Sequence, residues 1–76
     1  ILTQNMINKP DTIYEIRYDF DLNGNTINIP KNCTLKFEGG SLSNGTMDFN
    51  NTKIYSSTNY NIKTNVSGVI LDFVFF

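Results

Sequence analysis

Two stretches of the sequence decide the fold: Leu22-Asn23-Gly24-Asn25-Thr26-Ile27-Asn28-Ile29 and, twenty residues later, Leu42-Ser43-Asn44-Gly45-Thr46-Met47-Asp48-Phe49. A third copy opens at Ile62 and, after an insertion of four residues, closes as Ile70-Leu71-Asp72-Phe73. Each copy ends in alternating polar and apolar residues, the period-two pattern of a half-buried strand. A repeat of about 20 to 25 residues built from strands and Asn/Gly turns is typical of a stacked solenoid, and here it predicts a parallel β-helix.

The amino-acid composition favours strands over helices. The 76 residues include twelve Asn, eight Thr, nine Ile and six Phe, and they contain no Ala, His or Trp. Ile, Thr and aromatic residues fit strands, whereas Ala, the best helix former, is missing. Asn and Gly provide the left-handed backbone positions at which short strands turn. We therefore expect an all-β chain with no helix longer than a turn or two.

Charge and composition exclude several function classes. The formal net charge is −1, with both signs interspersed, so no basic stripe is available for nucleic acid. No apolar run is long enough to insert into a membrane as a helix. Cys33 is the only cysteine and there is no histidine to activate it or to share a metal, so we expect a small buried side chain. No cofactor or metal site is predicted.

The chain divides into two pieces. Residues 1–11 are predicted to be a lead-in segment, because Pro10 and Asp11 at its end are typical of turns. Residues 12–76 are assigned to an amphipathic first strand, from Thr12 to Leu22, followed by the initial coils. In that strand an apolar face alternates with a charged face: Ile16, Tyr18, Phe20 and Leu22 against Glu15, Arg17, Asp19 and Asp21.

Stacking the repeats predicts three interior columns and tight corners. The columns are Ile27, Met47 and Leu71; Ile29, Phe49 and Phe73; and Leu22, Leu42 and Ile62. Leu35 and Ile54 are expected to share a register, and Phe49 to be buried between its neighbours. At least one of Gly39, Gly40 and Gly45 should have positive φ at a corner. The alternative is a small antiparallel sheet of hairpins, because Asn23-Gly24 and Asn44-Gly45 are strong hairpin signals.

The C-terminal stretch is apolar. Residues 70–76 include three Phe within the last four positions. An exposed apolar patch of this kind indicates a contact surface. Solenoids also need a polar capping repeat at each end. We therefore expect these residues to be the opening coils of a longer solenoid, incomplete at the C-terminal end, in which Phe73, Phe75 and Phe76 are covered by a further coil or a neighbouring subunit.

The repeats resemble those of a known class of protein. The resemblance is carried by four segments: Asp19-Phe20-Asp21-Leu22-Asn23-Gly24, Ile27-Asn28-Ile29-Pro30, Cys33-Thr34-Leu35-Lys36-Phe37-Glu38-Gly39-Gly40 and Leu42-Ser43-Asn44-Gly45-Thr46. They resemble the opening coils of pectate-lyase-like right-handed parallel β-helix proteins of gut Bacteroidetes and their tailed phages. The resemblance implies a right-handed coil. In the phages it implies a tail fibre or tailspike subunit, a homotrimer that contacts other tail components and host surface glycan. In the bacteria it implies a cell-surface or extracellular protein.

Three functions follow from the sequence. The first is a structural segment of a tail fibre or tailspike-like protein that attaches to a host surface. The second is the N-terminal part of a polysaccharide-degrading glycosidase or lyase, since Asp48 and Asp72 would stand at the same outward position of adjacent copies. The third is a glycan-binding module in which outward Tyr14, Tyr55 or Tyr60 stacks on sugar rings. The resemblance implies that these opening coils carry no known catalytic group, so no catalytic residue is assigned and the structural function is preferred.

Overall fold

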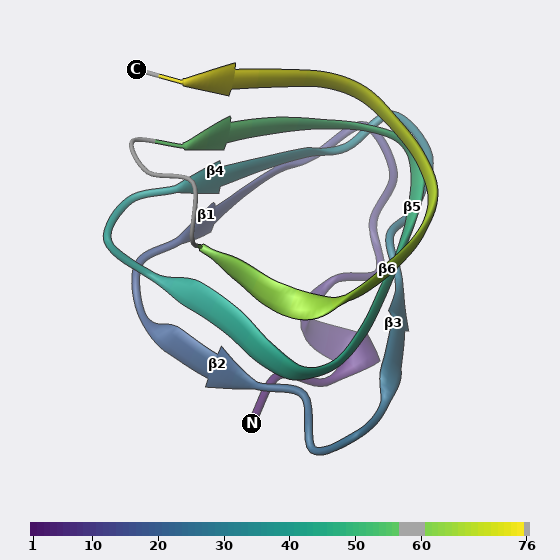
Figure 1. Ribbon diagram of the computed structural model, residues 1–76. Coiled ribbons are helices and arrows are strands. Elements are labelled where there is room, and N and C mark those ends of the chain that lie inside the picture. Colours follow the sequence, from purple (N-terminus) through teal and green to yellow (C-terminus); the bar gives the residue numbers. More distant parts are fainter. Residues whose placement is uncertain (57–60, 76) are drawn as a thin grey trace.

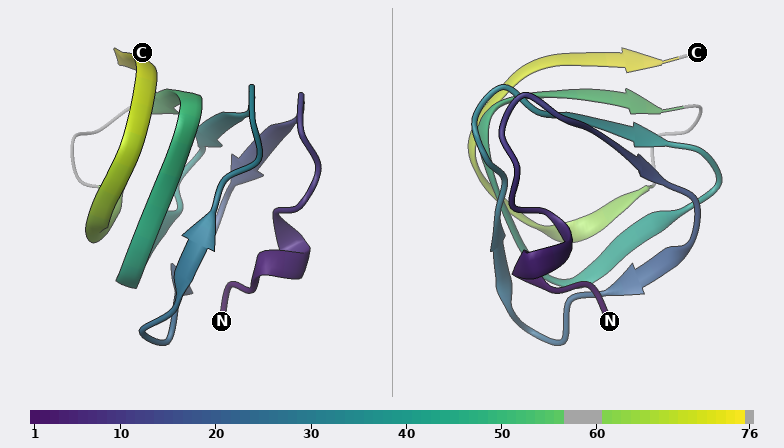
Figure 2. Two further views of the ribbon diagram at one scale, coloured as in Figure 1. Left: turned by 90° about the vertical axis from the view of Figure 1, so that its right-hand side faces the viewer. Right: turned by 180° about the vertical axis from the view of Figure 1, so that it is seen from behind.

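The chain winds into a right-handed parallel β-solenoid of about three turns in the computed structural model, which describes residues 1–56 and 61–75 (Figures 1 and 2). A short 3-10 helix, Gln4–Met6, precedes the strands. The strands are β1 (Ile13–Ile16), β2 (Asp19–Asp21), β3 (Thr26–Asn28), β4 (Thr34–Phe37), β5 (Ser41–Ser56) and β6 (Ile62–Phe75). Every strand pair is parallel, so the antiparallel hairpin alternative is wrong.

Each turn of the solenoid has three faces, and the long strands β5 and β6 continue around the corners (Figure 1). The first face stacks β1, β4, residues 52–56 of β5 and residues 70–75 of β6. The second face stacks β2, residues 41–43 and residues 62–63. The third face stacks β3, residues 46–50 and residues 65–69. Each coil thus has three strands and three corners, which gives the solenoid a triangular cross-section.

The core is a set of interior columns that run across the coils. Leu35 lies beside Ile54, as their spacing predicted, and Ile27 lies beside Met47. Branched and aromatic side chains fill the interior because each faces inward at every second position of its strand. The buried core comprises Leu2, Ile7, Ile16, Leu22, Ile27, Ile29, Cys33, Leu35, Phe37, Leu42, Met47, Phe49 and Ile54. The predicted burial of Phe49 and Cys33 is therefore confirmed.

One corner repeats a left-handed residue in successive turns. Asp11, Asn32 and Asn51 have φ values of 55°, 59° and 51°. Asn and Asp tolerate this conformation better than other side chains do. The Asn32 side-chain amide also donates to Asp11 Oδ1 over 2.7 Å, which joins two neighbouring turns at this corner. Gly39, at another corner, has φ of 92°, so the predicted positive φ among the three glycines is confirmed.

Gly40 and Gly45 are required for a different reason, the close approach of neighbouring turns. A Cβ atom at Gly40 would lie 2.6 Å from the Tyr18 backbone nitrogen and 2.8 Å from the Ile16 carbonyl oxygen. At Gly45 it would lie 2.5 Å from both the Asn25 carbonyl oxygen and Leu22 Cβ. These glycines allow the corners to stack tightly.

The predicted single strand from Thr12 to Leu22 is wrong. The chain bends after Ile16, so that β1 and β2 belong to different faces of the first turn. Tyr18 falls at the corner and is 73 % exposed. The alternation of apolar and charged residues does hold within each short strand, because Ile16 in β1 and Phe20 in β2 face the core and Glu15 and Asp21 are exposed.

Each of the three predicted columns contains one wrong residue. Leu42 pairs with Phe20 rather than with Leu22, although its predicted pairing with Ile62 is confirmed. In the third copy, Met47 pairs with Val66 and Phe49 with Gly68, whereas Leu71 and Phe73 were expected there. Phe73 instead pairs with Ile54 on the first face. The third turn thus keeps a spacing of 19 or 20 residues through these pairs, and the presumed insertion shifted the alignment by one face.

Candidate interaction surfaces

The residues that precede β1 close one end of the solenoid. We call residues 1–9 the N-terminal cap. Leu2 and Ile7 are buried in the core, and the Leu2 backbone N–H donates to the Asp21 carbonyl oxygen over 3.0 Å. Tyr14 reaches the same segment, because its hydroxyl accepts from the Lys9 N–H and donates to the Lys9 carbonyl. The cap therefore covers the interior of the first turn, beside β2 and β3 (Figure 2).

Gln4 completes this closure with its side chain. Its amide nitrogen donates to the Asn28 carbonyl oxygen over 2.7 Å, and its amide oxygen accepts from the Asn28 N–H over 2.7 Å. A carboxamide has the donor and the acceptor of a peptide group. The Gln4 side chain thus hydrogen-bonds to the edge of β3 as the backbone of a neighbouring strand would. Edges closed in this way do not pair with another chain.

The opposite end of the solenoid is open. β6 pairs with β5 along one edge, and no described residue pairs with its other edge. Val66 and Phe73 continue buried columns, yet they are 57 % and 39 % exposed, whereas Ile54 below Phe73 is 0 % exposed. Phe73 and Phe75 stack on each other with ring centroids 4.8 Å apart. An unpaired strand edge next to exposed apolar side chains is typical of an interaction surface.

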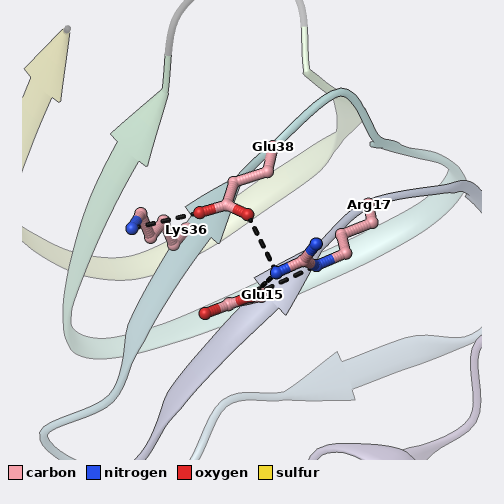
Figure 3. Close-up of polar contacts among 4 residues, drawn as sticks. All are labelled: Glu15, Arg17, Lys36 and Glu38. Carbon is pink, nitrogen blue, oxygen red and sulfur yellow. Dashed lines mark hydrogen bonds and ion pairs between the residues drawn. The ribbon is translucent and has the colours of Figure 1, made fainter.

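A charged ladder covers the outside of the first face. Arg17 bridges two turns: it is ion-paired with Glu15 in its own turn and lies 3.2 Å from Glu38 in the next turn (Figure 3). Lys36 Nζ lies 3.0 Å from the other oxygen of Glu38. The hydrogen bond from Arg17, with its positive charge, lowers the pKa of Glu15. Since these side chains are well exposed, the ladder contributes little to stability.

Asp21 occupies a second polar position, beside a turn on the outside. It accepts from the Asn23 backbone N–H over 2.6 Å and from the Asn44 side-chain amide over 2.8 Å. These two hydrogen bonds favour the charged carboxylate and lower the pKa of Asp21. Similar contacts between neighbouring turns join Ser41 to Asp19 and Ser67 to Asp48. The outer polar side chains therefore connect the turns to one another.

The structure separates the two candidate carboxylates. Asp48 pairs with Ser67 on the third face, whereas Asp72 pairs with Lys53 on the first face. The expected position of Asp48 and Asp72 in one outward column is therefore wrong. A glycosidase or lyase pair cannot be built from them, because such chemistry needs both carboxylates at one bond.

The two described candidate tyrosines, Tyr14 and Tyr55, lie on opposite sides of the first face. Tyr14 pairs with Leu35 and packs against the core, so its expected outward orientation is wrong. Tyr55 lies on the outer side of the first face, next to Lys36. Tyr60 lies outside the described residues. Of the two described candidates, only Tyr55 therefore faces outward.

No pocket and no cluster of metal-ligating side chains is present among residues 1–56 and 61–75. Cys33 is buried, and its thiol donates to the Lys9 carbonyl oxygen over 3.2 Å. Within the same described part of the chain, no helix has the length and apolar character needed to cross a bilayer. The features that remain as candidate sites are the open end and the outer polar ladders.

No family model, curated protein or solved structure matches the chain. Its candidate surfaces therefore have to be interpreted from their own geometry. Sequence reasoning missed the Gln4 closure, and it did not recognise that the turns at Asp11, Asn32 and Asn51 stack at one corner. The corner could have been found, because the spacings of 21 and 19 residues match the repeat. Gln4 carried no comparable signal.

Proposed function

We propose that this chain is a structural segment of a tail fibre or tailspike-like protein, present in a virion tail or on a bacterial surface, which helps attach the particle to a host. The open end supports this function best. There, the interior columns reach β6 and stop without a covering layer, so the solenoid is suited to be joined to further β-structure. Joining further coils would produce a shaft, because each coil of a solenoid contacts only its neighbours and the stack can be extended.

The rest of the surface fits a shaft better than an enzyme. The described residues offer no pocket in which a substrate could be enclosed. Outer side chains such as Asp19, Asp21 and Asp48 are used in hydrogen bonds between turns. A binding site for host glycan and the trimeric assembly implied by the resemblance remain predictions.

Localisation tests the proposal. Antibodies raised against the purified chain should label the tails of phage particles released by the strain that carries the gene. They should also reduce adsorption of the particles to host cells. Labelling of the outer surface of cells, without particles, would instead assign the chain to a bacterial surface fibre. Labelling confined to the cell interior would contradict the proposal.

A further inference from the structure

We propose that Asn23 is a site of covalent self-modification, at which the Gly24 backbone nitrogen attacks the side-chain amide and residue 23 becomes isoaspartate or aspartate. The inference goes beyond the proposed function and does not depend on it, because it concerns the chemistry of one corner of the fold. It is drawn from a comparison of two Asn-Gly sequences, Asn23-Gly24 and Asn44-Gly45, which lie at the same corner of successive turns.

The corner between the second and third faces is longer in the first turn than in the second. Residues 22–25 connect β2 with β3, whereas only residues 44 and 45 connect the corresponding paired positions of β5. The longer connection is a β-turn, closed by a hydrogen bond of 3.0 Å from the Asn25 N–H to the Leu22 carbonyl oxygen. Asn23 and Gly24 are its central residues, with φ of 52° and 77°, as in a type I′ turn. This turn projects beyond the later turns of the solenoid (Figure 1).

The environment of Asn23 leaves its side chain free to move. The side chain is exposed and forms no hydrogen bond with residues 1–56 or 61–75. Gly24 is exposed too, and a Cβ atom placed there would have no atom within 4 Å. The Gly24 N–H donates to the Asn44 carbonyl oxygen over 2.7 Å, so this bond has to open before the nitrogen can attack. Because no packed group moves with it, that opening is local to the turn.

The environment of Asn44 holds the second Asn-Gly sequence on both sides. The Asn44 side-chain amide donates to Asp21 Oδ1 over 2.8 Å, and a hydrogen bond to a carboxylate is stronger than one between neutral groups. A Cβ atom at Gly45 would lie 2.5 Å from Leu22 Cβ, so Gly45 is packed against the first turn. Rotating Gly45 toward the Asn44 side chain would therefore separate two turns, and the fold protects Asn44.

The reaction needs no group other than these two residues and water. The Gly24 nitrogen forms a bond to Asn23 Cγ, the bond from Cγ to Nδ2 breaks, and ammonia leaves with the proton of the Gly24 N–H. The product is a five-membered succinimide. Water then adds to one of its two carbonyl carbons, and the bond from that carbon to the Gly24 nitrogen breaks. Addition at the backbone carbonyl gives isoaspartate, and addition at Cγ gives aspartate. Glycine favours the attack because it has no Cβ atom to hinder the approach.

Isoaspartate at position 23 would loosen the corner that joins the first two turns. It adds a methylene group to the main chain within a turn that depends on hydrogen bonds from the Gly24 and Asn25 N–H groups. It also adds a negative charge two residues from Asp21, whose carboxylate accepts from the N–H of residue 23. We therefore expect faster hydrogen exchange at the Asn25 amide in the modified chain.

Peptide mapping by mass spectrometry tests the inference on the purified, folded 76-residue chain after incubation in mildly alkaline buffer. Trypsin cleaves after lysine and arginine, so the two Asn-Gly sequences fall in separate peptides, residues 18–31 and 37–53. Fragment spectra locate the change of mass, and methylation by a protein-isoaspartate methyltransferase detects isoaspartate. We expect Asn23 to react about tenfold faster than Asn44 or more, because only Asn44 has to lose a hydrogen bond to a carboxylate.

Two controls separate the effect of the fold from that of the sequence. In concentrated urea, Asn23 and Asn44 should react at similar rates, since each precedes a glycine. Gly24→Ala places a Cβ atom next to the attacking nitrogen, so it should slow the reaction at Asn23 by about tenfold or more and leave Asn44 unchanged. Circular dichroism should show that this variant remains folded.

Three results would overturn the inference. One is equal reaction of Asn44 and Asn23 in the folded chain. The second is a folded chain that stays unmodified while the chain in urea is fully converted. The third is a Gly24→Ala variant that reacts at the wild-type rate. Since none of these results concerns the localisation of the chain, the proposed function would still be decided by the labelling experiment.

Discussion

Phe49 and Phe73 both occupy interior columns of the same solenoid, but Phe49 is 3 % exposed and Phe73 is 39 % exposed. Phe49 has a turn on either side, with Ile29 in the turn before it and Gly68 in the turn after it. Phe73 has only Ile54 below it. The two residues share a strand pattern and differ in the presence of a covering layer. Burial in a solenoid is therefore a property of position in the stack, and the closed turns should carry most of the stability.

The largest expected effect is at a closed corner. Gly40→Ala would bring a methyl group within 2.6 Å of the Tyr18 backbone nitrogen, so two turns would have to separate. We expect a loss of more than about 4 kcal/mol, enough to unfold so small a chain. The matched control is Gly24→Ala, where no atom lies within 4 Å and only the positive φ is strained. Far-UV circular dichroism should show folded protein for Gly24→Ala alone.

The two phenylalanines provide the most direct test of the comparison. Phe49→Ala should lower the free energy of unfolding by about 3–5 kcal/mol, because it opens a cavity in a closed core. Phe73→Ala should cost only about 1 kcal/mol in the monomer, since much of the ring is already in water. Urea denaturation of the two variants measures both values. Equal losses would show that the open end is not exposed in solution.

The cap should make a smaller contribution. Gln4→Ala removes both side-chain hydrogen bonds to the Asn28 backbone, and we expect a loss of about 1–2 kcal/mol. Hydrogen exchange at the Asn28 amide should become faster. Gln4→Glu is the informative companion, because it can still accept from Asn28 but cannot donate to it. An unchanged exchange rate at Asn28 in Gln4→Ala would contradict the role of Gln4 as an edge closure.

The smallest effect concerns pH. The pKa values of Asp21 and Glu15 are lowered in the folded chain, so their charged forms stabilise it. That stabilisation is complete above the pKa values of the unfolded chain, and it is lost as the pH falls below about 4 through the lower folded values. Asp21→Asn should therefore flatten the loss of stability on acidification. Thermal unfolding between about pH 6 and 3 provides the measurement. A profile identical to that of the wild type would contradict a contribution from Asp21.

The sequence predicted the architecture because each repeat encodes it separately. Asn23-Gly24 and Asn44-Gly45 mark turns, and the strands after them alternate strictly, so two turns suffice to establish the period. The predicted register of the third turn was wrong for a physical reason. Val66-Ser67-Gly68 lacks an aromatic residue, whereas Leu71-Asp72-Phe73 repeats the pattern of Met47-Asp48-Phe49 on another face. Alternation specifies which side of a strand is buried, but not which face of the solenoid the strand occupies.

The candidate site was less predictable than the fold. Placing Asp48 and Asp72 together depended on that same register, so the error in the third turn removed the proposed carboxylate pair. Tyr18 was assigned to a strand because its neighbours alternate, although the chain turns there. The Gln4 closure depends on two hydrogen bonds between residues 24 positions apart, and no local pattern encodes such a contact.

The parallel ladders also determine how this chain would respond to force. The hydrogen bonds between turns run along the solenoid axis, and the two termini lie at opposite ends of it (Figure 2). Tension applied through the termini would therefore load one layer at a time. β6, held along a single edge, would peel first, followed by β5 and then the inner turns. Sideways bending would instead strain all three faces together. The solenoid is thus expected to resist bending and, under tension, to unfold one turn at a time from β6.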